Sequence, residues 1–281
     1  MNESKVTFLI AHYNCPEFIE ICLDSIRRFC SIPYQIMVGD NGSKPEYLDK
    51  LHRLLQPGDE LYEFSKPDWH TDILEKLYRK VTTRYAFILD QDCVLLSPEW
   101  VKLLDELKPP HRLMVGARDY CCIRNSPSMV HASFLLLDKT RIDENLTGPL
   151  FYGEKPGYET YQIEQPEPYH ALPCKALQFN PDSIVYLEPL SAPNYGCGNF
   201  WCYHNLPLAY HHWYSGRTAG FSPWVFFEGR PIRWFQKNKN RFIHDYQTGR
   251  IQIPDDQPGK PGMYRVTEGM KKFAGLWFNK R

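Results

Sequence analysis

The sequence has no excess of charge of either sign, no long apolar run and no C-x-x-C motif. Lys+Arg and Asp+Glu number 33 each in 281 residues, so overall charge gives no reason to expect a nucleic-acid or membrane partner. No window approaches the length of a transmembrane helix, and the first apolar segment, VTFLIA, is too short for a signal peptide. The nine cysteines are odd in number and scattered, as is typical of reduced thiols. We therefore expect a cytoplasmic protein without stable membrane insertion and without a nucleic-acid partner.

What the first third does contain is an alternation of short apolar runs with helical segments. In chain order, the pattern predicts a strand at 6–11, a helix at 16–29, a strand at 34–40, a helix at 46–55, a short apolar segment at 61–64, a helix at 72–82 and a strand at 85–89. This order is typical of parallel strands joined by right-handed crossovers. We therefore predict an α/β fold, a Rossmann-type αβα sandwich with a mainly parallel central sheet.

The pattern is looser after about residue 112. MVGAR and SMVHASFLLLD are typical of strands, and the second is expected to lead into a short helix. Residues 148–195 are rich in Pro, Tyr and Glu, which predicts loops around an acceptor pocket.

Polar residues follow each of the three predicted strands of the first third. They are HYN at 12–14, DNGS at 40–43 and DQD at 90–92. Parallel strands bring their carboxyl ends to one edge of the sheet, which is where open α/β sheets bind nucleotides. Asp90 and Asp92 are then candidates for a divalent cation, because carboxylate oxygens suit hard ions such as Mg²⁺ or Mn²⁺.

The segments VTFLIAHYN, IMVGDNGS and FILDQDCVL, in this order and spacing, resemble the nucleotide-sugar-binding half of family-2-type glycosyltransferases with the GT-A fold. The resemblance covers about residues 5–100 and, more weakly, 211–217. It implies that the loop after the first strand holds the nucleotide, that Asp40 meets the base, and that Asp90 and Asp92 hold the sugar nucleotide and its metal. The nucleotide-sugar-binding residues expected on this basis are Tyr13, Asn14, Asp40, Asn41, Asp90 and Arg217.

A third metal ligand is expected in AYHHWYSGR (209–217), because in members of the family a histidine late in the sequence often coordinates the metal. His211 and His212 both match by position, and the sequence does not choose between them. The planar guanidinium of Arg217 could form hydrogen bonds to the donor diphosphate.

An inverting transfer also needs a carboxylate that deprotonates the acceptor hydroxyl. We expect it in GYETYQ, where Glu159 stands among aromatic residues, although the family usually shows an acidic pair or an Asp here. Asp138, Glu154 and Glu164 are the alternatives.

Three residues before the helix at 72–82 are weaker candidates. By resemblance, Trp69, His70 and Thr71 lie where relatives place donor contacts, and Asp72 is expected to cap the helix.

A second constellation has the ligand types of a zinc site. Cys197, Cys202 and His204, with Cys174 or a later histidine, could form one, but CGNFWCYH lacks the C-x-x-C pairing of recognisable zinc sites. Buried thiols and a packed histidine are the favoured interpretation.

The end of the chain is basic. From Arg217 onward there are 13 Lys+Arg against 5 Asp+Glu, and WVFFEGRPIRWFQKNKNRF (224–242) interleaves aromatic and basic residues. This segment could rest peripherally on an anionic membrane and bring the site to a lipid-linked acceptor. We favour rings packed on the sheet and charges in water, because Pro231 is expected to interrupt a continuous amphipathic helix. Any binding to anionic vesicles should then be weak and sensitive to salt.

These observations predict a catalytic domain over 1–217 and a C-terminal extension over 218–281 packed on it. The catalytic domain would comprise a nucleotide-sugar half at about 5–110 and an acceptor half at about 111–217. The predicted activity is metal-dependent transfer of a sugar from a nucleoside-diphosphate sugar to a glycan, lipid-linked or other hydroxyl acceptor, with inversion.

Three alternatives compete with this hypothesis. A nucleotidyltransferase normally has a Gly-rich, basic loop after the first strand, and AHYNCPEF has neither Gly nor Lys/Arg. A glycoside hydrolase needs two opposed carboxylates and no nucleotide site. A non-catalytic scaffold protein would have no need of an intact Asp90 and Asp92.

Overall fold

A computed structural model describes residues 5–65, 68–119, 129–151, 171–196, 198–212, 226–227 and 230–255. The helices are α1 (Pro16–Phe29), α2 (Pro45–Leu54), α3 (His70–Tyr78), α4 (Leu103–Glu106), α5 (Lys139–Asn145), α6 (Ala171–Phe179) and α8 (Ile232–Gln247), with short 3-10 turns at Pro98–Lys102 and Pro193–Tyr195. The strands are β1 (Val6–His12), β2 (Tyr34–Asp40), β3 (Glu60–Glu63), β4 (Tyr85–Asp90), β5 (Cys93–Leu95), β6 (Met114–Asp119), β7 (Met129–Asp138), β8 (Ile184–Ser191), β9 (Gly198–Tyr203), β10 (Leu206–His212), β11 (Phe226–Phe227) and β12 (Arg230–Pro231).

Ten of these strands form one mixed sheet in the order β3-β2-β1-β4-β7-β6-β8-β9-β10-β5. The strands β3, β2, β1 and β4 are mutually parallel, and β1 lies between β2 and β4. The chain therefore builds the sheet outward from β1 first on one side and then on the other, so the order of strands reverses beside β1 and β4. In open α/β sheets, the carboxyl ends of the strands at such a reversal are the usual place for a ligand.

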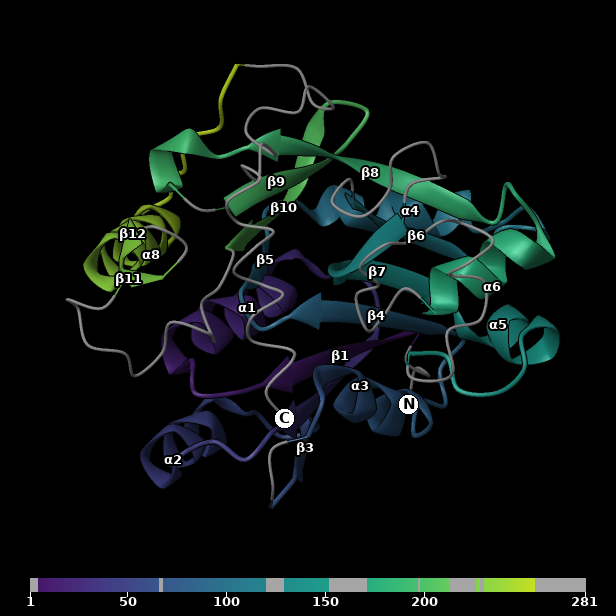
Figure 1. The fold of residues 1–281 in the computed structure, drawn as a ribbon, viewed down its shortest axis with the longest axis horizontal. Helices are drawn as coiled ribbons and strands as arrows, with labels where there is room; N and C mark the ends of the chain where they lie inside the picture. Colours follow the sequence, from purple (N-terminus) through teal and green to yellow (C-terminus); the bar gives the residue numbers. More distant parts are fainter. Residues whose placement is uncertain are drawn as a thin grey trace.

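Helices cover both faces of the sheet because the residues of β1 alternate between two apolar cores. Phe8 and Ile10 pack on the face covered by α1 and α2, whereas Leu9 and Ala11 pack on the face covered by α3 and α6. Figure 1 shows α1 and α3 on opposite sides of β1 and β4. Burial of β1 on both faces explains why its sequence is continuously apolar instead of alternating with polar residues.

The predicted elements of the first third are confirmed, with α1 and β2 at their expected bounds. MVGAR and SMVHASFLLLD also form strands, and the second leads into α5 as expected. The prediction of loops throughout 148–195 is wrong, because α6 and β8 lie within it. Apolar runs such as ALPCKAL and SIVYL form these elements, and the Pro and Tyr content of the whole segment concealed them.

The start of α3 also differs from expectation. The helix begins at His70, two residues earlier than predicted, and Trp69 occupies its N-cap position without a side-chain cap. Asp72 lies in the first turn and shares a hydrogen bond with the carboxylate of Asp68, and burial with this acidic neighbour raises the pKa of Asp72. The predicted capping role of Asp72 is therefore wrong.

As expected, no continuous helix runs across Pro231: β11 and β12 precede α8, and Pro231 is the N-cap residue of this helix, which covers the 16 residues that follow. Proline fits this position since its missing N–H would have no partner in the first turn of a helix. The helix buries Ile232, Phe235 and Tyr246 against α1 and the turn at Pro193–Tyr195. Among the residues described, no helix is both long enough and apolar enough to cross a membrane.

Candidate functional site

Asp90 and Asp92 lie on the tight turn that joins β4 to β5. Asp90 is the last residue of β4 and pairs with Ala11 of β1, so it lies at the carboxyl ends of the parallel strands. The side chain of Asp90 is 15% exposed and Asp92 is 7% exposed as a residue. Two partly desolvated carboxylates this close together repel one another unless cations or hydrogen-bond donors face them.

β10 brings a histidine to this turn. It pairs antiparallel with β5, placing His211 opposite Cys93, and the His212 backbone N–H donates to the Asp92 carbonyl at 3.0 Å. The Nε2 atom of His211 lies 3.3 Å from Oδ1 of Asp92 and 3.5 Å from Oδ2 of Asp90. Burial lowers the pKa of His211, but the two carboxylates outweigh it and hold this pKa above its ordinary value.

His212 points to the opposite face of the same strand. Its ring packs 4.9 Å from Phe18 of α1, and its Nδ1 is hydrogen-bonded to the Tyr210 hydroxyl at 2.8 Å. Burial lowers the pKa of His212 to about 3, so its imidazole is neutral at physiological pH. Because successive side chains of a strand point to opposite faces, His211 faces the site and His212 faces the core.

One carboxylate oxygen from each aspartate and one nitrogen of His211 lie within 4.8 Å of one another, and no other such cluster occurs within the described ranges. The Oδ1 atom of Asp90 is buried and has no hydrogen-bond partner. An unsatisfied buried carboxylate oxygen is costly, and a divalent cation would relieve that cost. The donor set of two oxygens and one nitrogen suits a cation that keeps positions open for other ligands.

The nearby thiols of Cys22 and Cys93 are unsuited to act as ligands. Both are completely buried, and burial together with the charges of Asp90 and Asp92 raises their pKa values. Neither thiol belongs to the cluster formed by Asp90, Asp92 and His211.

Two more imidazoles surround Asp90. His70, at the first position of α3, has Nε2 3.6 Å from Oδ1, and His131 of β7 has Nδ1 4.0 Å from Oδ2. The His131 Nδ1 atom accepts a hydrogen bond from the Ser133 backbone N–H at 3.0 Å, which leaves the proton of the neutral ring on Nε2. His131 was not among the residues predicted for the site; its signal in the sequence is an imidazole inside the mainly apolar strand MVHASFLLL.

Gln91, between the two aspartates, fastens the loop after β1 to the turn after β4. Its Oε1 accepts from the Tyr13 backbone N–H at 2.9 Å and its Nε2 donates to the Tyr13 carbonyl at 3.3 Å. This two-point contact spans the carboxyl ends of β1 and β4 and leaves the Tyr13 side chain 39% exposed at the same edge. Sequence reasoning treated the middle residue of D-Q-D as a spacer and missed this role.

Asp40 lies at the same edge but is almost completely buried. Its Oδ1 pairs with Nδ1 of His12 at 2.9 Å, and its Oδ2 accepts from the Ser43 N–H at 2.9 Å. Burial favours protonation, but the hydrogen bonds from His12 and Ser43 outweigh it and lower the pKa of Asp40. The carboxylate is therefore ionised and fixes the loop after β2.

The side chains of the two asparagines predicted to bind the donor form hydrogen bonds with backbone groups of neighbouring loops. Asn41 donates through Nδ2 to the Asp68 carbonyl at 2.9 Å and accepts from the Asp68 N–H at 2.7 Å. Asn14 has a φ of 48° and accepts from the Lys44 N–H at 2.9 Å. Together they fix the strand-end loops around the edge where Asp90 lies.

Among the weaker candidates, Thr71 is completely buried, whereas Trp69 is 58% exposed at the start of α3. With Tyr13, Trp69 is one of the large aromatic side chains left accessible on the loops after the parallel strands.

The predicted base Glu159 and the predicted phosphate contact Arg217 lie outside the described residues, as do Glu154 and Glu164. The remaining alternative, Asp138, pairs with Tyr85 at the start of β4, at the opposite edge of the sheet from Asp90. It is completely buried and bound by Arg84 at 2.9 Å, so it is poorly placed to act as the base.

The zinc interpretation gains no support from the described residues. Cys174 and Cys202 belong to different apolar clusters, and His204 stands at the turn between β9 and β10 with a φ of 46°. Cys197 is outside the described part of the chain.

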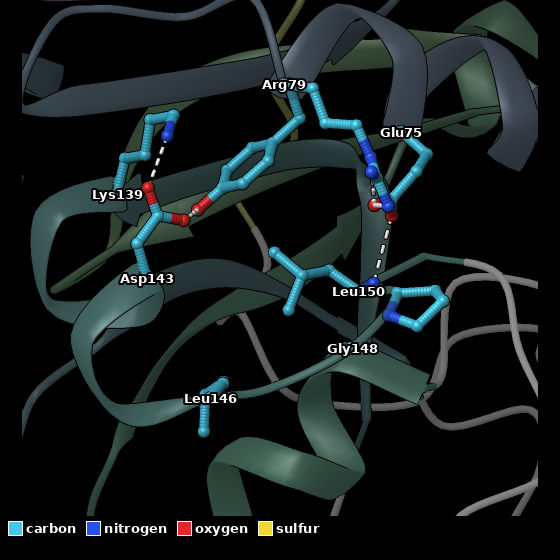
Figure 2. A pocket seen from close by; sticks show the side chains of 9 residues that line it. Glu75, Arg79, Lys139, Asp143, Leu146, Gly148 and Leu150 are labelled. Atoms are coloured by element: carbon cyan, nitrogen blue, oxygen red, sulfur yellow. Dashed lines mark hydrogen bonds and ion pairs between the residues drawn. The ribbon is translucent and has the colours of Figure 1, made fainter.

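A shallow pocket of about 480 Å³ lies between α3 and α5, at the C-terminal end of α3, whereas His70 at the other end of the helix faces Asp90. In Figure 2 its charged side chains point toward one another. Glu75 pairs with Arg79 at 3.0 Å and accepts from the Leu150 N–H at 2.9 Å, and Asp143 accepts from the Tyr78 hydroxyl at 3.0 Å. These contacts anchor the segment that precedes residue 152, and the charges satisfy one another.

Close approach of β9 to β10 depends on Gly198, where an added Cβ would lie 2.4 Å from the Tyr210 hydroxyl and 2.6 Å from the His211 carbonyl. Gly198→Ala should therefore displace β10 and destabilise the fold by about 1–3 kcal/mol. Thermal unfolding of the variant and of the wild type measures the loss. An unchanged melting temperature for Gly198→Ala would contradict this packing.

The comparisons with known proteins agree with this geometry. The model of glycosyl transferase family 2 matches residues 7–171. Among solved structures, the galactosyltransferase LgtC in complex with donor and acceptor sugar analogs matches with a TM-score of 0.54 and 11% identity over 89% of this chain and 98% of its own. This likeness confirms the GT-A fold.

Two further structures match less well. The mannosyltransferase PcManGT from Pyrobaculum calidifontis, in complex with GDP-Man and Mn²⁺, has a TM-score of 0.44 and 15% identity over 65% of this chain and 74% of its own. TarS of S. aureus has a TM-score of 0.45 and 11% identity over 65% of this chain and 35% of its own. No curated protein matches by sequence.

Proposed function

Because this chain belongs to glycosyl transferase family 2 and is a glycosyltransferase, we propose that it transfers a sugar from a nucleoside-diphosphate sugar to a hydroxyl acceptor with the help of a divalent cation. The observation that carries the proposal is the convergence of Asp90, Asp92 and His211 at the carboxyl edge of the parallel strands. The family had already been indicated by the three strand-end segments of the sequence.

Asp90, Asp92 and His211 would hold the cation, Mn²⁺ or Mg²⁺. When bound, such an ion supplies Lewis-acid stabilisation for the negative charge that builds on the departing diphosphate. Three protein ligands leave coordination positions for phosphate oxygens and water.

The loops after β1 and β2 would receive the nucleoside. Gln91 and Asn41 hold these loops in place through paired hydrogen bonds, so the donor meets a preformed edge. The accessible ring of Tyr13 could stack on the base. A direct contact from Asp40 to the base stays a prediction, and it would use lone pairs that His12 and Ser43 leave open.

Glu159 remains the proposed general base and Arg217 the proposed phosphate contact. A base would take the proton of the acceptor hydroxyl as that oxygen attacks the anomeric carbon, with inversion of configuration. The acceptor would be a glycan, a lipid-linked sugar or another hydroxyl compound, and residues 218–281 would form an extension packed on the catalytic domain. We further propose a cytoplasmic location with at most peripheral membrane contact.

A donor panel tests this function. The protein is incubated with Mn²⁺ or Mg²⁺ and each common nucleotide sugar, and release of nucleoside diphosphate is measured, since slow donor hydrolysis often proceeds without an acceptor. One donor should be hydrolysed well above the rest, and a chelator should stop the release. Hydrolysis unaffected by excess chelator would exclude the proposed cation role, and direct titration of each donor by calorimetry would separate weak turnover from lack of binding.

A further inference from the structure

The outward face of α8 carries a row of basic side chains. Arg233, Lys237 and Arg241 recur every four residues and are all exposed, so they lie along one side of the helix. We call these three residues the α8 basic stripe. At 1.5 Å per residue, the stripe is roughly 12 Å long.

Negative charge is scarce on this helix. Its one acidic residue, Asp245, is 9% exposed and accepts a hydrogen bond from the Tyr195 hydroxyl at 3.1 Å. Lys237 and Arg241 make no ion pair within the described part of the chain. Asp245 follows Arg241 by one helical turn but is buried against Tyr195, so no exposed carboxylate lies beside the stripe on this helix.

The inward face of α8 packs against the rest of the protein. Phe242 stacks on Tyr210 with ring centroids 3.8 Å apart, and the Tyr246 hydroxyl donates to Asp24 of α1 at 2.9 Å. Ile232 and Phe235 are buried as well. An amphipathic helix inserts into a bilayer through its apolar face, and this face is unavailable, so α8 can bind a surface only through its charges.

The helix is also fixed relative to the candidate site. Lys239 lies 3.6 Å from Glu17 in the first turn of α1, and Phe242 contacts Tyr210, the residue before His211. Figure 1 shows α8 alongside α1. A surface bound by the stripe would therefore meet the protein in one orientation relative to Asp90 and Asp92.

We propose that the α8 basic stripe docks the protein on an anionic lipid surface. A straight row of cations on the convex side of a helix can meet a flat, negatively charged surface all at once, whereas a soluble polyanion would gain most from a concave site. Charge complementarity alone sets the affinity, so docking is reversible and sensitive to salt. The inference is independent of the donor chemistry, because it needs neither cation nor nucleotide sugar.

Sedimentation with vesicles tests the proposal on the full chain, without donor or cation. Phosphatidylcholine vesicles are compared with vesicles that contain about 30% phosphatidylserine, at low salt and at roughly 0.3 M salt. Wild-type protein should bind the phosphatidylserine vesicles at low salt only. Arg233→Gln/Lys237→Gln/Arg241→Gln should bind at least about tenfold more weakly, since each basic residue near an anionic bilayer contributes severalfold.

A matched variant separates the stripe from net charge. Arg53→Gln/Lys102→Gln/Lys108→Gln removes three exposed cations from α2 and the region around α4, and it should bind within about twofold of wild type. Circular dichroism and thermal unfolding show that both variants fold.

Several outcomes would overturn the proposal. They are no wild-type binding at low salt, equal loss in the two triple variants, or binding to neutral vesicles that persists at high salt. Soluble polyphosphate that binds as tightly per phosphate as the vesicles would show a polyanion site instead of surface docking.

Discussion

Asp92→Asn should abolish cation-dependent turnover, with a loss of at least about a hundredfold, and leave the fold intact. The amide keeps the shape of the side chain but removes the charge that would hold the cation, and metal sites depend strongly on each ligand.

The measurement has two arms. Mn²⁺ binding is followed by electron paramagnetic resonance, and nucleoside diphosphate release is followed with the donor that the panel identifies. Asp105→Asn is the matched control, because its carboxylate is 66% exposed and pairs with Lys108 far from the site. Wild-type Mn²⁺ affinity in Asp92→Asn would remove Asp92 from the proposed ligand set.

Asp90→Asn should also weaken cation and donor binding. Its Oδ1 atom, which has no hydrogen-bond partner, becomes either an amide oxygen or an NH₂ group facing His70.

Much of the fold could be predicted from the sequence because the first third is regular. VTFLIA and YAFIL are buried on both faces, and a parallel strand buried in this way has a continuous apolar run that pattern reasoning recognises. The segments 171–179 and 184–191 escaped prediction because their neighbours are rich in Pro and Tyr. Proline at 231 was correctly expected to prevent a continuous helix over 224–242, and α8 begins directly after it, with Pro231 as the N-cap.

The candidate site was predictable in part for the same reason. Residues that follow parallel strands meet at one edge, so Asp90 and Asp92 were found from their place after YAFIL. Contacts between strands far apart in sequence are invisible to this reasoning. The approach of His131 to Asp90 depends on the antiparallel pairing of β7 with β4, which no local pattern reveals.

Because local patterns do not reveal contacts between distant segments, the hydrogen bonds of the asparagines and of Asp40 could not be predicted either. Polar residues at strand ends were expected to face the ligand, but Asn41 and Asp40 use their side chains on the protein's own backbone. Local hydrogen bonds of this kind satisfy loop N–H and C=O groups that would otherwise be buried unpaired. Sequence position identifies the edge, whereas the hydrogen bonds decide which side chains remain available to a donor.

The two adjacent histidines should respond to alanine in opposite ways. His211→Ala removes a proposed ligand and should weaken Mn²⁺ binding at least tenfold. His212→Ala should leave Mn²⁺ affinity unchanged but lower the free energy of unfolding by about 2–4 kcal/mol, because it leaves a cavity beside Phe18 and removes the buried hydrogen bond between His212 and the Tyr210 hydroxyl.

Thermal unfolding in chelator and in Mn²⁺ distinguishes the two effects in one experiment. A ligand that binds only the folded state stabilises it by RT ln(1 + [L]/Kd), so a tenfold weaker affinity removes about 1.4 kcal/mol at saturating Mn²⁺. His212→Ala should melt well below wild type yet keep the full Mn²⁺-induced shift, whereas His211→Ala should lose at least about 1.4 kcal/mol of the stabilisation by Mn²⁺. A lost shift in His212→Ala and a preserved one in His211→Ala would mean that β10 presents the other face to Asp92 and that its register against β5 is off by one residue.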